Sequence, residues 1–556
     1  MKKRLPLSAV TVALLLAWIV GYPLLMTLVE ALGGSSWFGG GSRGGWTLEH
    51  FRQFFARSDE WIALWRSLWI SAASVVLAAL VGVPLAFLFE RTEFPGRRFL
   101  GAVAALPVAL PPLVGVLAFL FLYGESGFVS RAVQALLGLE QPPWRLAGPG
   151  AILLVHAYSM YVYFYLFTRA GLSRLDAALL EAAASLGAGR ARTLWRVTLP
   201  LLRPALVSAA LLTFMTSLAS FSAPYIFGGG FRVMTTQIVA SKLNGDVGMA
   251  QVETVMLAVL ALLGLWAMRR ADRAAGATGV RGVAPSRRHL RSPLARLGTG
   301  AVGWLLAGLL LLPHAVLLLV SLVPPFTWTN QWVPPVLQLS NWTGLFAQPE
   351  KLRPVLNSLW MAAASTIAAL ALGFVAARLS VVRKGFLSAA LDWLIALPWA
   401  IPGTVFAVAL ATTFGVSQPW LGRFVLIGTP WILPLAYLVR SLPLTGRGAL
   451  AGLRSLDPAL EEAAASLGAD RWRRLWRVVV PMLRPALAAG AGLAFITALG
   501  DFVVSVVLYT YDTRPISMEI VSSLRLQDLG TAAVYGVLLM TASTAAFLLW
   551  GRSEAR

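Results

Sequence analysis

Residues Asp176–Leu206 read DAALLEAAASLGAGRARTLWRVTLPLLRPAL, and residues Asp457–Leu487 read DPALEEAAASLGADRWRRLWRVVVPMLRPAL. The two stretches are identical at 23 of 31 positions, and they align without a gap, so that Gly187 corresponds to Gly468. A shorter match, Ala105-Leu106-Pro107 with Ala396-Leu397-Pro398, has a slightly wider spacing. Self-similarity of this kind indicates two copies of one structural unit. The change in spacing predicts that the first copy is ten residues longer before its shared stretch.

The composition excludes a soluble protein. Hydrophobic residues make up 58% of the 556 residues, charged residues only 13%, and the mean hydropathy is +0.73. Soluble domains carry about 25% charged residues, so most side chains here must face lipid or other helices. The chain has no cysteine and four histidines. This rules out a disulfide framework and a thiolate metal site; whether other residues bind a metal is unknown at this level.

The apolar residues are grouped into stretches of membrane-spanning length. A bilayer core about 30 Å thick needs roughly 20 apolar residues in a helix, and twelve stretches meet or approach that length. They are Leu7–Val29, Ser67–Phe89, Leu100–Tyr123, Ala151–Thr168, Leu201–Phe221, Val252–Met268, Val302–Val323, Ser358–Leu379, Phe386–Phe414, Phe424–Val439, Met482–Val507 and Thr531–Trp550. Prolines in the third and ninth stretches predict kinks there: Pro107, Pro111, Pro112, Pro398 and Pro402.

These patterns predict an all-α integral membrane protein with about twelve transmembrane helices in two tandem, parallel six-helix repeats. Six spans return the chain to its starting side, so both copies have the same topology. We expect the first repeat to occupy residues 1–270, a linker residues 271–298, and the second repeat residues 299–556. The first apolar run could instead be a secretory signal, but its length favours a retained helix.

The basic residues predict the orientation. Lys and Arg number 46 against 24 Asp and Glu, an excess that in a soluble protein would suggest nucleic-acid binding. Here they lie between apolar runs, so we expect a lipid bilayer and no nucleic-acid partner. Six arginines fall within Arg169–Arg203. Because Lys and Arg are retained on the cytoplasmic side, the shared stretches and both termini are predicted to be cytoplasmic.

Each shared stretch is predicted to form two short helices around a break. Asp176 and Asp457 precede Ala-rich sequence and are suited to cap a helix N-terminus. Gly187 and Gly468 follow that sequence, where glycine can end a helix in a left-handed turn. A basic helix containing Trp then follows.

Pro200 and Pro481 are expected to close that basic helix and start the next span. An interfacial helix at the lipid headgroups would explain the Trp and Arg residues. It would not explain the preceding Ala-rich helix that carries Glu181 or Glu462, since small side chains give lipid little to hold. Small side chains suit close approach by a protein partner, so we interpret the Ala-rich helices as docking surfaces.

The shared stretch resembles the signature of the membrane subunits of type I ABC importers, E-A-A-x(3)-G-x(9)-I-x-L-P. The first copy matches it at Glu181, Ala182, Ala183, Gly187, Val197, Leu199 and Pro200, and the second at Glu462, Ala463, Ala464, Gly468, Val478, Val480 and Pro481. Val replaces Ile in both copies, and Val480 replaces Leu. The resemblance extends over both halves of the chain.

The resemblance implies that the Ala-rich helices couple to two copies of an ABC ATPase subunit, with Glu181 and Glu462 in polar contact and Gly187 and Gly468 forming the turn. It implies alternating access between the two six-span halves in the cytoplasmic (inner) membrane. A periplasmic or lipid-anchored substrate-binding protein would deliver the cargo. The sequence contains no G-x-x-x-x-G-K-[ST] phosphate loop. We therefore expect a transport subunit with no cofactor of its own, and ATP and Mg²⁺ on the partner ATPase.

Polar residues inside the spans are candidates for a translocation path, because such residues are costly in lipid. They are Asp501 in the eleventh stretch and His156, Tyr158 and Tyr161 in the fourth. The alternative interpretation is structural: Asp501 as a buried partner, the tyrosines as packing residues, and His156 bonded to a neighbour. The same alternatives apply to His314 in the seventh stretch.

The resemblance also gives an indication of the cargo. Fused permeases with two such motifs resemble the ferric-iron importer branch, with thiamine and polyamine or phosphonate importers as relatives, and the run from His156 to Gly171 is similar to the iron branch. The expected cargo is ferric iron. Two other classes are an ion-coupled secondary transporter and an integral membrane enzyme. Neither explains the paired docking stretches.

Overall fold

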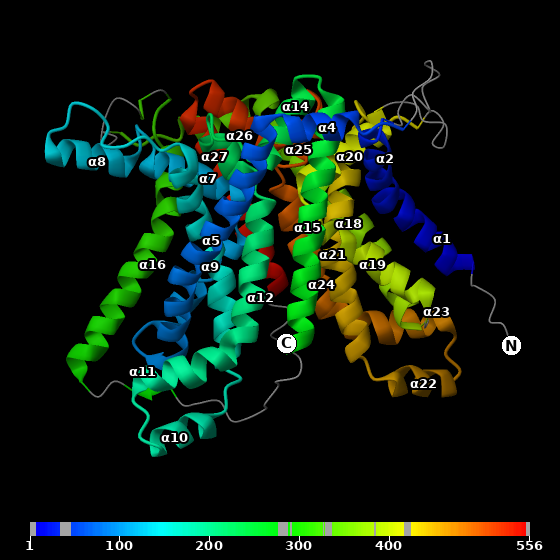
Figure 1. The fold of residues 1–556 in the computed structure, drawn as a ribbon, viewed down its shortest axis with the longest axis horizontal. Coiled ribbons are helices and arrows are strands. Elements are labelled where there is room, and N and C mark those ends of the chain that lie inside the picture. Colours follow the sequence, from blue (N-terminus) through cyan, green and yellow to red (C-terminus); the bar gives the residue numbers. More distant parts are fainter. Residues whose placement is uncertain are drawn as a thin grey trace.

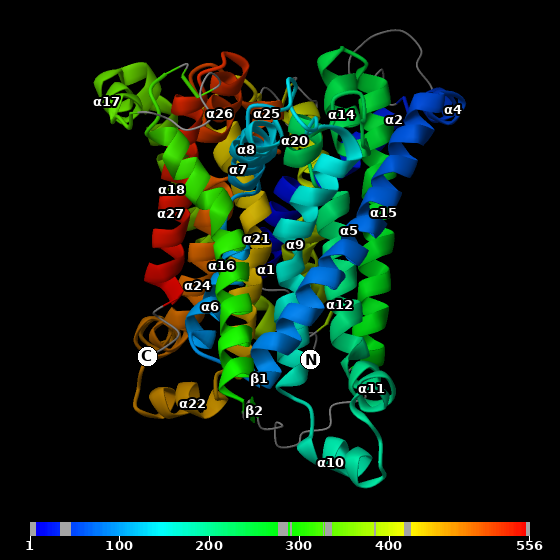
Figure 2. The ribbon, with the colours of Figure 1, turned by 90° about the vertical axis from the view of Figure 1, so that its left-hand side faces the viewer.

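The computed structural model describes residues 7–33, 46–275, 287–289, 292–325, 327–328, 336–382, 385–415 and 424–551. These residues form a bundle of long helices with short helices at both ends (Figures 1 and 2). Within these described ranges, ten helices are long and apolar enough to cross a membrane, and one bent pair could form an eleventh span. The prediction of an all-α membrane protein is confirmed. Within the described residues, the β structure is one parallel pair, β1 (Thr92–Glu93) with β2 (Arg288–His289).

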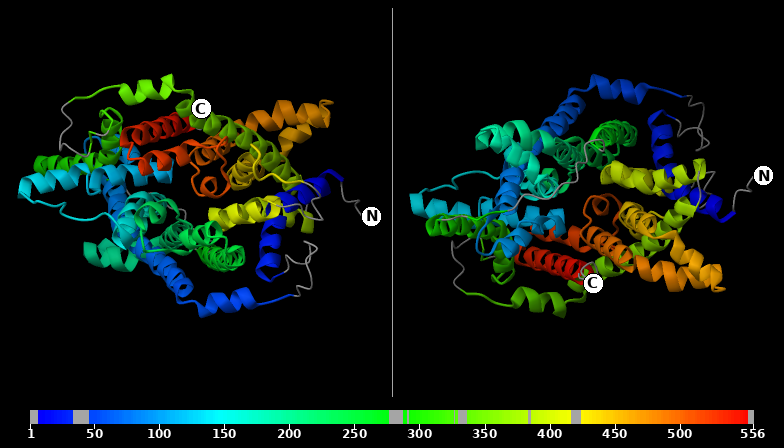
Figure 3. Two further views of the ribbon diagram at one scale, coloured as in Figure 1. Left: turned by 90° about the horizontal axis from the view of Figure 1, so that it is seen from above. Right: turned by 90° about the horizontal axis from the view of Figure 1, so that it is seen from below.

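Each copy contains the same group of four packed helices. They are α5 (Ser58–Arg91), α9 (Gly148–Leu172), α12 (Leu199–Leu218) and α15 (Val247–Ala275) in the first copy, and α18 (Pro349–Val382), α21 (Ile432–Ser455), α24 (Val480–Leu499) and α27 (Leu529–Gly551) in the second. In both groups the third helix contacts the other three. Figure 3 shows the two copies side by side, with the chain before α5 (blue) and the chain before α18 (green) on opposite edges.

The first span of each copy packs on the other copy. The first span consists of α1 (Leu7–Leu16), a π-helical turn η1 (Ala17–Gly21) and α2 (Tyr22–Ala31), and it contacts α19 (Phe386–Ala400) and α20 (Gly403–Gly415). Conversely, α16 (Pro293–Ser321) contacts α6 (Arg97–Val103) and α7 (Pro112–Tyr123). The halves are therefore interleaved, and neither buries its apolar surface without the other.

The predicted third and ninth spans are broken, which is a larger change than the expected kinks. A 3₁₀ turn η2 (Leu106–Ala109) separates α6 from α7, and α19 meets α20 at 110°. Proline forces the preceding residue into an extended conformation and cannot donate a backbone hydrogen bond. Leu110 before Pro111 and Ile401 before Pro402 are both extended. The two prolines are equivalent in the aligned copies, so the breaks are a property of the repeat.

The predicted tenth span, Phe424–Val439, is displaced in the structure. Its helix is α21, which begins at Ile432, and the residues from Phe424 to Trp431 before it are not helical. α21 carries Arg440, Arg447 and Arg454, and it is not among the helices apolar enough to face lipid. About half of its residues are buried, including Tyr437 and Val439, whereas Arg440 is half-buried and Arg447 and Arg454 are exposed.

The short helices divide between the two ends of the bundle. One end, here called the inner end after the predicted orientation, carries α10 (Ala177–Ser185) and α22 (Pro458–Ser466) (Figures 1 and 2). The opposite, outer end carries α4 (Glu49–Ala56), α8 (Phe128–Leu137), α14 (Met234–Leu243), α17 (Ser340–Ala347) and α26 (Ile516–Arg525). α8 follows α7 in the part of the first copy where the ten additional residues are predicted.

Two equivalent glycines allow the closest helix crossings, which predicts a selective effect of added side chains. A Cβ on Gly82 of α5 would overlap the backbone of α9 at Tyr161, and a Cβ on Gly373 of α18 would lie 2.9 Å from the Gly446 amide of α21. We expect Gly82→Ala and Gly373→Ala each to destabilise the protein by about 1–3 kcal/mol. Thermal unfolding in detergent measures this as a lower melting temperature.

The matched control for these variants is Gly308→Ala in α16, where no atom lies within 4 Å of the added Cβ. An equal loss of stability in all three variants would contradict the close-packing explanation.

Candidate functional site

Each predicted docking stretch forms a short, capped helix at the inner end. The Asp176 carboxylate accepts a hydrogen bond from the Ala178 N–H of α10 at 3.0 Å. In the second copy, the Asp457 carboxylate accepts one from the Ala459 N–H of α22 at 2.9 Å. A side chain that binds a free N–H in this way stabilises the start of a helix. Both predicted caps are confirmed.

Both helices end in the same left-handed turn. Gly187 has φ +72° and Gly468 has φ +80°, values that glycine adopts without strain. In the first copy, the Gly187 N–H bonds to the Ala184 C=O at 2.9 Å, and the next N–H bonds to the Ala183 C=O at 3.0 Å. The second copy repeats both bonds. This Schellman turn reverses the chain while satisfying the last carbonyl groups of the helix.

The two short helices are uncovered by the rest of the chain. No residue of α10 or α22 is buried, and Glu181 and Glu462 are exposed. Leu186 and Leu467, at the turns, are 88% and 89% exposed. Large apolar side chains exposed to this degree beside a small-residue helix are characteristic of an interaction surface. The geometry thus agrees with the docking interpretation, and it places Ala182, Ala183, Ala463 and Ala464 on these two helices.

Beyond the turn, the chain is helical without interruption into the membrane span. α11 (Arg190–Thr193) leads through a π-helical turn η3 (Leu194–Thr198) into α12, and α23 (Arg471–Arg474) leads through η5 (Leu475–Val479) into α24. The expectation that Pro200 and Pro481 close a helix is wrong. Each lies in the first turn of the span, and the preceding wider turn accommodates the missing N–H.

An ion pair attaches α22, but not α10, to its own copy. Arg378 of α18 donates two hydrogen bonds to the Glu461 carboxylate, at 2.6 and 2.5 Å. These bonds hold the pKa of Glu461 below its usual value. The residue that corresponds to Glu461 in α10 is Leu180. The two docking helices therefore have the same fold but different attachments.

Asp501, a predicted path residue, lies at the break that follows α24. Its carboxylate pairs with the Arg440 guanidinium of α21 and accepts a hydrogen bond from the Val504 N–H at 2.9 Å. The Asp501 carbonyl accepts the hydroxyl groups of Ser505 and Ser517, each at 2.7 Å. The side chain is 3% exposed. These contacts give Asp501 a clear structural role, because they satisfy the backbone where the helix stops.

His156 lies on α9, next to the corresponding break of the first copy, which follows α12. Its Nε2 lies 2.9 Å from the hydroxyl oxygen of Ser220, which is the counterpart of Asp501. Its Nδ1 lies 2.9 Å from Ser74 Oγ and 3.2 Å from Ser217 Oγ. The imidazole therefore joins α5, α9 and α12 through serine hydroxyls.

Tyr158 and Tyr161 bond to backbone carbonyls of neighbouring elements. The Tyr158 hydroxyl donates to the Leu310 C=O of α16 at 2.8 Å, and the Tyr161 hydroxyl donates to the Ala104 C=O beside the break after α6 at 2.8 Å. The hydrogen bonds of these tyrosines link neither of them to His156 or Asp501.

Two residues that the sequence analysis missed join the copies instead. Phe221 and Phe502 are equivalent in the aligned copies, directly after Ser220 and Asp501, and their ring centroids are 5.4 Å apart. Tyr225 packs against both rings and accepts a hydrogen bond from Arg525 of the second copy at 2.5 Å. The occurrence of Phe at equivalent positions of both copies was the sequence signal that could have identified this pair.

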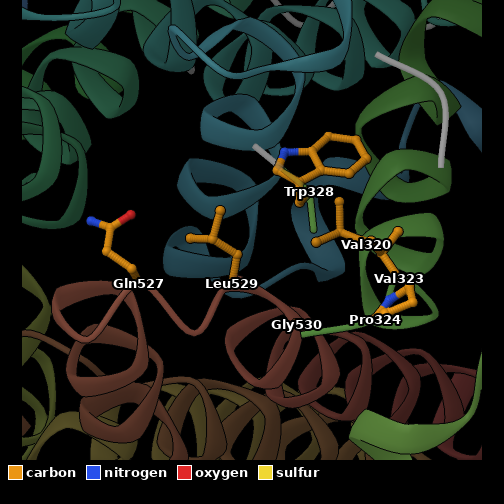
Figure 4. A pocket seen from close by; sticks show the side chains of 7 residues that line it. All are labelled: Val320, Val323, Pro324, Trp328, Gln527, Leu529 and Gly530. Atoms are coloured by element: carbon orange, nitrogen blue, oxygen red, sulfur yellow. The ribbon is translucent and has the colours of Figure 1, made fainter. Parts of the chain in front are cut away.

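The structure contains little that resembles a metal or ligand site. Within the described ranges, no group of three or more His, Asp or Glu side chains could hold a metal ion. A cavity of about 210 Å³ lies at the outer end, between α16 and α27 (Figure 4). It is lined mostly by apolar groups, from Val320, Val323, Pro324, Trp328, Gln527, Leu529 and Gly530. None of the predicted path residues lines it.

Comparison with known proteins identifies the family. The model of the binding-protein-dependent transport system inner membrane component matches residues 80–276 and 369–556, and each match contains one docking helix. The chain belongs to this family of ABC transporter permeases. It is thus a multi-pass membrane component of a transport system, with the two repeats that the sequence predicts.

Full-length relatives support the same assignment. A probable ABC transporter permease of Sinorhizobium fredii is 32% identical, over 88% of this chain and 86% of the relative. The ferric transport system permease FbpB of Actinobacillus pleuropneumoniae is 28% identical, over 87% and 70%. The thiamine transport system permease ThiP of Escherichia coli is 27% identical, over 87% and 90%. These similarities extend across both repeats of this permease.

The ion pair on α22 predicts an asymmetric response of the two docking helices. Arg378→Ala removes the attachment of α22 and should cost about 1 kcal/mol locally, because the pair is partly exposed. Hydrogen exchange should become faster in α22 and stay unchanged in α10. Acidification should have the same effect, because the carboxylate loses its charge as the pH falls through the lowered pKa of Glu461.

The control variant is Arg454→Ala, which removes an ion pair with Asp392 and leaves α22 untouched. Equal acceleration in α10 and α22 on Arg378→Ala would disprove the asymmetry.

Proposed function

We propose that this permease forms both halves of the translocation path of an ABC importer and moves a small solute, with ferric iron as the first choice, into the cytoplasm. The cargo would arrive from a periplasmic or lipid-anchored binding protein, and two copies of an ABC ATPase would supply ATP and Mg²⁺. The membrane is the cytoplasmic (inner) membrane, with both termini in the cytoplasm. The observation that carries the proposal is the pair of capped, unburied helices α10 and α22 at one end of the molecule.

The docking role rests on chemistry that the two helices share. Each offers a small-residue surface with one exposed carboxylate, Glu181 or Glu462, and an exposed leucine at its turn. A partner backbone can approach alanines closely, the leucine can enter an apolar pocket, and the glutamate can pair with a basic group. Because α11 and α23 lead into α12 and α24 as continuous helices, a displacement of either docking helix moves a membrane span.

The translocation path would lie between the breaks that follow α12 and α24. There the Phe221–Phe502 contact joins the two halves, and its separation would open the path toward the outer end. Asp501 and Ser220 would line the path beside the two rings, with His156 bonded behind Ser220. Tyr158 and Tyr161 would hold its wall through their bonds to α16 and to the chain after α6.

The choice of cargo draws on the relatives. Two permeases described as ferric transport components are 28% identical to this chain, and a thiamine permease is 27% identical. Ferric iron ranks first because more than one ferric relative matches most of the chain, thiamine ranks second, and polyamine or phosphonate third. An ion-coupled secondary transporter would have no use for two exposed docking helices.

Charge reversal at both docking helices tests the ATPase partnership. Glu181→Lys combined with Glu462→Lys should reduce co-purification of the ATPase by at least about tenfold, since each lost charged hydrogen bond costs about 1.5–3 kcal/mol. Membrane insertion should be normal, because neither side chain is buried. The control is Glu350→Lys, an exposed glutamate at the start of α18 on the outer side. Wild-type recovery of the ATPase with the double variant would refute the docking role.

Uptake by the reconstituted system tests the cargo. Proteoliposomes that contain the permease and its ATPase should accumulate ferric iron when the loaded binding protein is added outside and ATP inside. Thiamine offered in the same way should not accumulate. Uptake of thiamine without uptake of iron would reverse the ranking and leave the ATP-coupled import function intact.

A further inference from the structure

Two glutamates meet inside the first copy at its outer end. Glu60 lies in the first turn of α5 and Glu253 in α15, and they are 1% and 0% exposed. Both accept hydrogen bonds from α14, at Gln237 and Ser241, which lie one helical turn apart. α14 lies at the end of the bundle opposite to α10 (Figures 1 and 2). The docking and gating residues discussed above do not include this pair.

The surroundings of the pair supply hydrogen bonds but no charge. The Gln237 amide of α14 donates to Glu60 Oε1 at 3.1 Å, and the Ser241 hydroxyl of α14 donates to Glu253 Oε1 at 2.7 Å. The Oε2 atoms of both glutamates are buried and have no hydrogen-bond partner. A buried carboxylate oxygen without a partner is costly. Each carboxyl group therefore has one oxygen with a hydrogen-bond partner and one oxygen without.

The charged groups nearby do not neutralise the pair. Arg57 and Asp59, next to Glu60 in sequence, and Asp246, in the turn between α14 and α15, are the charged groups that act on it. Arg57 is already paired with Asp246 at 3.2 Å. On α14, Lys242 interacts instead with Glu30 of α2. Two neighbouring carboxylates without a cation between them cannot both be ionised in a buried site.

The second copy has no such pair at the equivalent place. Lys351 corresponds to Glu60 when α5 is aligned with α18, and Tyr535 corresponds to Glu253 when α14 and the chain after it are aligned with α26. The Tyr535 hydroxyl donates to the Lys351 C=O at 2.7 Å, and the Lys351 ammonium lies 4.0 Å from Asp528. In the second copy, the equivalent helices pack at this place without two acidic residues. The acid pair is therefore particular to the first copy.

We propose that Glu60 and Glu253 together form a binding site for one proton, taken from the outer compartment, which holds α14 against α5 and α15. The two carboxyl groups share this proton, which replaces their repulsion by a hydrogen bond. When it dissociates at alkaline pH, two negative charges face each other in a buried site, and α14 loosens. No cation and no cofactor takes part in this equilibrium.

The pair is connected to the contact between the halves. The Thr235 hydroxyl of α14 donates to the Ser220 C=O at 2.7 Å, and the Met234 N–H donates to Ser67 Oγ at 2.7 Å. Ser220 precedes Phe221, whose ring meets Phe502. The proton therefore stabilises α14, which bonds to the chain at the break after α12. A change of pH in the outer compartment thus affects the stability of that break.

The test uses the full-length permease in detergent or nanodiscs and needs neither ATPase nor cargo. Melting temperature and hydrogen exchange of α14 are recorded between mildly acidic and alkaline pH for the wild type, Glu253→Gln, Glu60→Gln and Glu350→Gln. The wild type should lose a few degrees as the pH rises, and α14 should exchange on the order of tenfold faster. The two glutamine variants imitate the protonated acid and should show no such change. Glu350→Gln, at the exposed residue that corresponds to Asp59 at the start of α18, should behave like the wild type.

Infrared difference spectra of the wild type give a second readout that does not depend on any variant folding. A band of a protonated carboxyl group should disappear over the same alkaline range. A wild type whose stability and carboxyl band do not change with pH would overturn the proposal. So would a wild type that is stabilised by added Ca²⁺ or Mg²⁺ and weakened by a chelator, since the pair would then hold a metal ion.

Discussion

A rigid connection between an exposed helix and a membrane span is the constraint on which the rest of this molecule depends. The turn at Gly187 or Gly468 satisfies the carbonyls that end the docking helix, so the docking helix can be short and still ordered. The π-helical turns before Pro200 and Pro481 let the following helix enter the membrane without a flexible joint. A loop at either place would absorb a displacement. In the structure, the helix continues without a break from α11 into α12 and from α23 into α24.

Inside the bundle, polar side chains form hydrogen bonds mainly with backbone groups. A helix that stops within an apolar environment leaves N–H and C=O groups that no water can reach. The Asp501 carboxylate accepts the Val504 N–H, and Tyr161 donates to the Ala104 C=O. These bonds account for residues that hydropathy alone marks as anomalous. A polar residue in a span is therefore weak evidence for a binding site when a helix break lies within reach of it.

The sequence predicts the repeated architecture and the docking helices well, because both depend on local signals. Asp176 caps its own helix, Gly187 forms its own turn, and the alignment of the two copies is visible without any structure. The breaks at Pro111 and Pro402 were underestimated, since tertiary packing decides whether proline bends a helix or ends it. The start of α21 was misplaced because its three arginines lower its hydropathy. The Phe221–Phe502 contact and the Glu60–Glu253 pair join residues far apart in sequence, so periodicity could not find them.

At the breaks after α12 and α24, the two copies share hydrogen bonds from side-chain hydroxyl groups to backbone carbonyls. They differ in the bonds between side chains. Thr235 bonds to the Ser220 carbonyl in the first copy, and Ser517 bonds to the Asp501 carbonyl in the second. At the same two breaks, the side-chain pairs differ. His156 bonds to Ser220 in the first copy, and Arg440 pairs with Asp501 in the second. A homodimeric permease must place identical residues at both positions. A single chain with two repeats escapes that restriction, so the two halves share the same backbone bonds at the breaks while each carries its own charges at the breaks, at α10 and α22, and at the outer end.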